Sequence, residues 1–217
     1  QFRWTKGGAE CAVKHAGAVS QENLSFRIKL HSFAHLFNST IFIAVLLTSL
    51  SSIGVWWAGV QGLIPEWMVR LSGIFLIGFV LIAGVYLASY FIARKSFLSS
   101  FFGVIWQLPL FLSVSMGLAL HNAQAVWEGL TGKKSPFIRT PKFNLESGKV
   151  SLSSNRYILH RMPITTWFEG LLALVFWVMV GLAFREGNFL FLPFHAMLAF
   201  GYTLVFVSSF KSYGLGR

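Results

Sequence analysis

Long apolar runs separated by short polar segments make up most of this chain. A helix needs about 20 apolar residues to cross the hydrocarbon core of a bilayer. Four charge-poor runs approach that length: 40–60, 71–93, 164–184 and 189–210. The pattern predicts an all-α membrane protein with about four transmembrane helices, because a helix satisfies its backbone hydrogen bonds internally within lipid.

Residues 1–38 have a different pattern, in which apolar side chains recur at helical spacing on one face only. These side chains are Phe26, Leu30, Phe33 and Phe37. An amphipathic helix of this kind lies in the headgroup plane of a membrane. His31 and His35 are one helical turn apart and could share a metal, but no third ligand is nearby, which favours an interfacial polar pair. His195 lies inside the last apolar run, where we expect it to hydrogen-bond to a neighbouring helix.

Residues 96–130 allow two interpretations. No charge occurs from 96 to 127, but Gln107 and Pro109 interrupt the middle, and proline breaks the helical hydrogen-bond ladder. Basic residues flank both ends, so a crossing segment would place the most basic loop outside, against the positive-inside rule. The charge pattern therefore favours an interfacial or re-entrant hairpin, with both ends of the chain in the cytoplasm.

Composition supports a membrane class, with 55% hydrophobic and 12% charged residues. The net charge of +11 comes from basic residues gathered between the apolar runs, where cytoplasmic loops are expected to be positive. This distribution argues against nucleic acid as a partner. All acidic residues are Glu, so the sequence cannot supply a D-x-D metal–nucleotide site, and the single cysteine, Cys11, excludes an intrachain disulfide.

The first residues, Gln1-Phe2-Arg3-Trp4, place a cation beside an indole. Arginine can hold a phosphate through two parallel hydrogen bonds, and a tryptophan face can stack on a sugar ring or a cation. An aromatic-belt Trp beside a snorkelling Arg is the alternative. Residues 1–8 resemble the Q-x-x-R-W motif, often Q-Q-F-R-W-x-K-G, of processive family-2 glycosyltransferases. Gln1 matches the variable second position, so the resemblance covers Arg3 and Trp4 but leaves Gln1 in doubt.

Residues 131–163 form the longest polar segment, with seven basic residues and one acid, Glu146. Within it, Phe137-Ile-Arg-Thr-Pro-Lys142 is similar to the F-x-V-T-x-K gating loop of bacterial cellulose synthase, with Arg139 in place of Val. A Thr hydroxyl and a Lys ammonium can hold a diphosphate, and Phe137 could close over it. An ordinary basic cytoplasmic loop is the alternative.

These resemblances imply the C-terminal membrane region of an inverting, bacterial family-2 glycosyltransferase in the inner (plasma) membrane. An upstream α/β domain would bind a UDP- or GDP-sugar with Mg²⁺ or Mn²⁺ and supply the catalytic residues, so the fragment alone would be inactive. Trp4 would bind the polysaccharide acceptor. Four residues would bind the nucleotide diphosphate: Arg3, Phe137, Thr140 and Lys142. The helices would export the growing β-linked chain.

A non-enzymatic transporter or flippase subunit is the alternative function. It would account equally well for the apolar runs and the basic loops. It would not account for the Arg3-Trp4 pair together with the pattern at 137–142.

Overall fold

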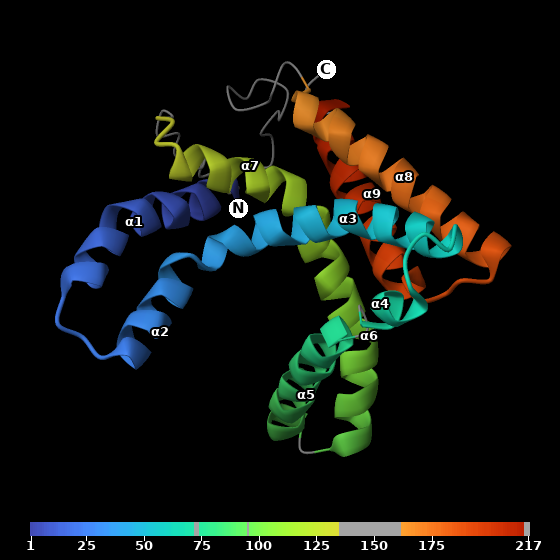
Figure 1. Cartoon of the computed structure of the whole chain (residues 1–217), viewed down its shortest axis with the longest axis horizontal. Helices are drawn as coiled ribbons and strands as arrows, with labels where there is room; N and C mark the ends of the chain where they lie inside the picture. Colours follow the sequence, from blue (N-terminus) through green and yellow to red (C-terminus); the bar gives the residue numbers. More distant parts are fainter. Residues whose placement is uncertain (72–73, 95, 135–161, 215–217) are drawn as a thin grey trace, which may run out of the picture. The chain divides into compact units, whose positions relative to one another are not determined.

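A computed structural model describes residues 1–71, 74–94, 96–134 and 162–214 of the chain. Every regular element in these ranges is a helix (Figure 1). The elements are α1 (Phe2–Gln21), α2 (Phe26–Leu36), the short 3₁₀ helix η1 (Asn38–Thr40), α3 (Ile41–Val60), α4 (Glu66–Leu71), α5 (Phe75–Arg94), α6 (Phe97–Gly117), α7 (Ala119–Leu130), α8 (Ile164–Glu186) and α9 (Leu192–Gly214). The predicted all-α class is confirmed.

Four of the described helical segments are long and apolar enough to cross a membrane. They are Asn38–Val60, Phe97–Gly117, Ile164–Glu186 and Leu192–Lys211. Three coincide with predicted runs. The predicted run 71–93 overlaps α5 (Phe75–Arg94), which has 20 residues, and the described apolar part of α5 is Ile77–Ala93. The long apolar helices are those of an all-α membrane protein, and α6 is one of them.

Gln107 and Pro109 lie inside α6, which continues through both residues without a break. A proline removes only one backbone donor from the ladder, and covering groups can compensate within a membrane protein. The break instead falls at Leu118, between α6 and α7. Whether residues 96–130 cross the bilayer stays a prediction of the charge pattern.

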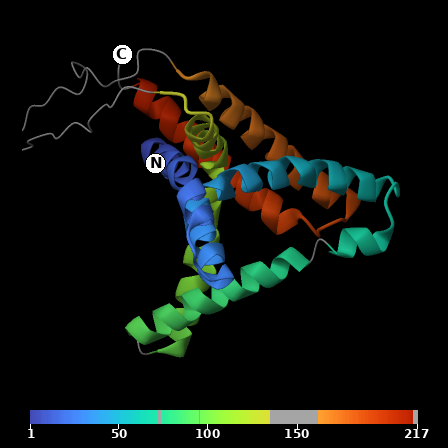
Figure 2. The same cartoon turned by 60° about the vertical axis from the view of Figure 1, so that its left-hand side comes forward.

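The chain divides into two compact units. The first comprises residues 1–46, 118–171 and 203–217, and the second comprises 47–117 and 172–202. In the first unit α1 packs against α7 and α2, and in the second α5 packs against α6 (Figure 1 and Figure 2). The candidate site lies in the first unit.

The core of the second unit joins α3 to α9 through a buried polar pair. Ser52 Oγ and His195 Nε2 are 3.0 Å apart. Phe176 lies against His195 with ring centroids 5.6 Å apart, and it stacks on Tyr202 at 6.0 Å. The expected hydrogen bond from His195 to a neighbouring helix is confirmed.

Two glycines bring α6 and α9 into backbone contact within this unit. A Cβ at Gly201 would collide with the Ser113 carbonyl group, and one at Gly117 would collide with the Gly201 backbone. Close approach through small residues is a general way to pack membrane helices, since lipid provides no hydrophobic drive for their association. The absence of a side chain at both positions therefore fixes the separation of the two helices.

We expect Gly201→Ala to lower the free energy of unfolding by about 1–3 kcal/mol, the usual cost of overpacking. Gly181→Ala on α8 is the matched control. A Cβ at Gly181 meets nothing within 4 Å, and alanine has the higher helix propensity. Unfolding of the purified chain by SDS titration measures both variants. Equal stability of the two variants would contradict the close approach of α6 and α9.

Candidate functional site

The candidate site is built on α1 and α7, which pack side by side in the first unit (Figure 1 and Figure 2). Three contacts follow each other in the same order along both helices. Phe2 meets His121 edge to face with ring centroids 5.1 Å apart, Lys6 pairs with Glu128, and Ala9 lies against Gly129. The two helices therefore run parallel.

Small residues allow the two helices to approach closely. Ala9 and Ala12 of α1 and Ala125 of α7 are completely buried. A Cβ at Gly129 would lie 2.7 Å from both the Ala9 Cβ and the Lys6 carbonyl oxygen. Only glycine fits at this contact without a shift of α1. The packing thus fixes the position of α1 along α7.

This packing leaves Gln1, Arg3 and Trp4 exposed at the beginning of α1. Phe2 and Lys6 are one turn apart, and both contact α7, so they define the inward face. The Trp4 side chain is 80% exposed. Its indole ring is large and apolar, and on this surface it is available to stack on a ligand. The structure therefore places Arg3 and Trp4 next to each other and accessible.

Lys6, Glu128 and Lys133 form an ion cluster between α1 and the end of α7. Lys6 Nζ donates hydrogen bonds to Glu128 Oε2 at 3.2 Å and to the Lys133 carbonyl oxygen at 2.5 Å. Lys133 Nζ donates to Glu128 Oε1 at 2.7 Å. The side chains of Lys6 and Glu128 are only 5% and 10% exposed. Because burial of an unpaired charge is costly, each of these two residues requires the other.

The two lysines also set the protonation state of the acid. The hydrogen bond from Lys133 is the largest influence and lowers the pKa of Glu128, and the hydrogen bond from Lys6 lowers it further. Together these contacts outweigh the opposing effect of burial. Glu128 is therefore a carboxylate at neutral pH, and the cluster carries a net charge of one positive unit.

The last turn of α7 holds the backbone at Lys133 in place. Gly132 has a φ of +70°, a left-handed conformation that favours glycine at a helix end. The Lys133 N–H donates to the Glu128 carbonyl oxygen at 3.0 Å, and the Gly132 N–H donates to the Gly129 carbonyl oxygen at 3.3 Å. These two bonds make a Schellman motif. Lys133 is thus fixed through its backbone N–H, its carbonyl group and its ammonium group.

The predicted diphosphate-binding residues Phe137, Thr140 and Lys142 lie outside the described residues. Lys133 precedes this segment by only four positions, counting to Phe137. The ion cluster therefore connects α1, whose first turn contains Arg3 and Trp4, to Lys133, which lies shortly before this segment in the sequence.

The sequence interpretation did not include Lys6, Glu128 or Lys133 in the site. One signal was available: Glu128 is the first charged residue after a long uncharged stretch, and a carboxylate in such surroundings requires a cation. Its neighbour in the chain, Lys133, could have been proposed from spacing. Lys6 could not, because it is 122 positions away from Glu128.

His121 closes the other end of the helix pair beside Phe2. Burial lowers the pKa of its imidazole, so His121 is neutral at pH 7 and suited to packing against an aromatic ring. Among the described residues, no group of three His, Cys, Asp or Glu side chains lies close enough together to hold a metal ion.

Three kinds of comparison with known proteins gave no relative from which a role could be transferred. No protein-family model, no curated protein and no solved structure matches the chain. The geometry of the first unit and the two sequence motifs are therefore the basis from which we infer a function.

Proposed function

We propose that this chain is the membrane region of a processive family-2 glycosyltransferase, the part that binds the acceptor and exports the β-linked product. The observation that carries the proposal is the ion cluster. It joins the helix that presents Arg3 and Trp4 to Lys133, directly before the segment with the Phe137–Lys142 pattern. Two motifs far apart in the sequence would thereby serve one ligand.

In this mechanism Trp4 stacks on the terminal sugar of the acceptor. Arg3 pairs with the diphosphate of the donor, whose negative charge grows as the bond to the transferred sugar breaks. Lys142 and Thr140 hold the same diphosphate, and Phe137 covers it, which excludes water from the reacting atoms. A catalytic domain upstream binds the UDP- or GDP-sugar with Mg²⁺ or Mn²⁺. The apolar helices guide the product across the bacterial inner membrane.

The test is nucleotide release by the full-length parent protein in membranes, with a panel of UDP- and GDP-sugars and either Mg²⁺ or Mn²⁺. We expect one donor to support release, and Trp4→Ala and Lys142→Ala each to lower the rate by at least about tenfold, equivalent to about 1.4 kcal/mol of transition-state stabilisation. Lys134→Ala is the matched control, since Lys134 is an exposed lysine outside both motifs.

The possible results separate the functions. Sugar-dependent release that both substitutions reduce, with the control unchanged, supports the enzyme and its site. Release that neither substitution affects removes the site assignment. If the protein is folded but releases no nucleotide with any donor, the assignment as a glycosyltransferase is overturned and a transporter or flippase subunit is favoured.

A further inference from the structure

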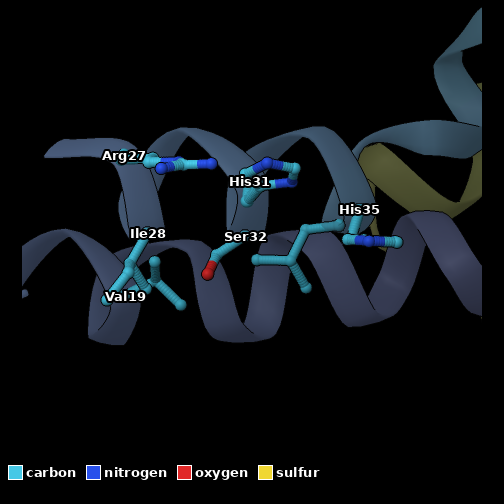
Figure 3. A pocket seen from close by; sticks show the side chains of 7 residues that line it. Val19, Arg27, Ile28, His31, Ser32 and His35 are labelled. Atoms are coloured by element: carbon cyan, nitrogen blue, oxygen red, sulfur yellow. The ribbon is translucent and has the colours of Figure 1, made fainter. Parts of the chain in front are cut away.

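A groove of about 690 Å³ lies between α1 and α2, away from the ion cluster. Seven residues line it: Val19, Arg27, Ile28, His31, Ser32, His35 and Leu36. Figure 3 shows the three nitrogen-bearing side chains in a row along α2, with Ile28 and Ser32 directed towards the neighbouring helix. The lining is therefore basic along one side and apolar along the floor.

The row has the chemistry of an anion site. Arg27, His31 and His35 follow each other at four-residue spacing, which places them on one face of α2. A guanidinium group binds phosphate oxygens through two parallel hydrogen bonds, and imidazole N–H and hydroxyl groups can add further donors. Ser32 supplies the hydroxyl. No acidic residue lines the groove, so an anion there would meet no opposing charge from its walls.

The surroundings of the groove are those of a helix lying at a membrane surface. Phe26 and Leu30 of α2 are 81% and 58% exposed. Large apolar side chains on an amphipathic helix insert at the boundary of headgroups and acyl chains. The apolar floor of the groove, formed by Val19, Ile28 and Leu36, matches an acyl chain rather than a small soluble anion. The α1–α2 groove thus combines a phosphate-binding row with an apolar floor.

We propose that the α1–α2 groove binds a phospholipid with an anionic headgroup. The headgroup phosphate contacts Arg27, His31 and His35, and an acyl chain lies on Val19, Ile28 and Leu36. Both contacts are required for the selectivity. The phosphate of phosphatidylcholine is accompanied by a choline cation that Arg27 repels, and a soluble phosphate contacts only the basic row.

The experiment is native mass spectrometry of the purified chain in detergent with added dioleoyl-phosphatidylglycerol or dioleoyl-phosphatidylcholine. We expect wild type to retain phosphatidylglycerol selectively. Arg27→Gln should lower its apparent affinity by about fivefold, the usual contribution of one basic residue near an anionic lipid surface, and the double variant His31→Gln/His35→Gln should lower it as well. Circular dichroism checks that each variant retains its helices.

Lys29→Gln is the matched control. Lys29 is on the same helix, and its replacement removes the same charge as Arg27→Gln. Lys29 does not line the groove, and its Nζ donates a hydrogen bond to the Ser20 carbonyl oxygen at 2.8 Å. An equal loss for Lys29→Gln and Arg27→Gln would mean diffuse attraction and would overturn the proposal. Displacement of the lipid by millimolar inorganic phosphate would also overturn it, because the acyl chain would then contribute nothing. Equal retention of phosphatidylcholine would do the same.

Discussion

Replacing Glu128 with Gln should lower the free energy of unfolding of the first unit by about 3 kcal/mol, because it leaves the Lys6 ammonium group buried without its counter-charge. The Lys6 side chain is 5% exposed, so water cannot readily take the place of the carboxylate. The substitution also leaves one acceptor oxygen where Glu128 offers two, one to Lys6 and one to Lys133, and it replaces the other with an NH2 donor. The expected effect is larger than that of any surface ion pair, which contributes about 0–1 kcal/mol.

SDS titration of the purified chain, followed by circular dichroism, measures the loss. Lys6→Met/Glu128→Leu is the decisive companion variant. When both partners of a buried pair become apolar, much of the stability returns, because no unpaired charge remains. Recovery in the double variant together with a loss in Glu128→Gln identifies the pair as the cause. A double variant less stable than Glu128→Gln alone would contradict this account.

The same pair should make the stability of the first unit depend on pH. The pKa of Glu128 is lowered in the folded chain, so the pair stabilises the fold fully above the ordinary pKa of glutamate, which is about 4.3. That contribution is lost as the pH falls through the lowered value, because the folded state then takes up a proton. The difference in stability between wild type and Glu128→Gln should therefore shrink in acid. A difference that stays constant would exclude the carboxylate as its origin.

The sequence predicted the membrane class correctly because hydropathy over about 20 residues reflects one dominant physical requirement. The ends of individual helices are harder to predict. Pro109 lies inside α6, since a single missing backbone donor does not end a helix whose other hydrogen bonds remain. The real break, at Leu118, follows Gly117, a residue that packs against the α9 backbone. The hydrophobic pattern around residue 117 cannot predict this contact, because the partner residues are distant in the sequence.

The candidate site was only half predictable for a related reason. A short motif predicts Arg3 and Trp4 as site residues; the structure shows that both are exposed, and their role in binding stays a prediction. The partners that hold α1 in place depend on contacts across more than 100 residues of sequence. A lone carboxylate such as Glu128 indicates that a cation must be near, but spacing cannot distinguish Lys6 from the other basic residues. Only the packing of α1 on α7 makes that choice.

Under the proposed function, Arg3→Ala in the protein that contains the catalytic domain should lower kcat for sugar transfer by about 100-fold, which is the usual loss when a donor to a developing negative charge is removed. The KM for the donor sugar should change less, because the diphosphate charge that Arg3 is proposed to stabilise grows mainly in the transition state. Arg3→Lys should recover only part of the rate, since an ammonium group cannot make the two parallel hydrogen bonds of a guanidinium group.

The control for Arg3 is Lys14→Ala on the same helix. Lys14 is exposed and lies farther along α1 than Ala9, which contacts α7. Its loss should leave kcat unchanged while lowering the charge of α1 equally. Full activity of Arg3→Ala would exclude the guanidinium group from the reaction and leave it as a snorkelling residue at the membrane surface. Equal losses in both variants would point to a general electrostatic effect of α1. A loss in kcat that is specific to Arg3→Ala, with Arg3→Lys intermediate, requires that the guanidinium group directly contact the charge that develops during transfer. The exposed first turn of α1 is where that contact would be made.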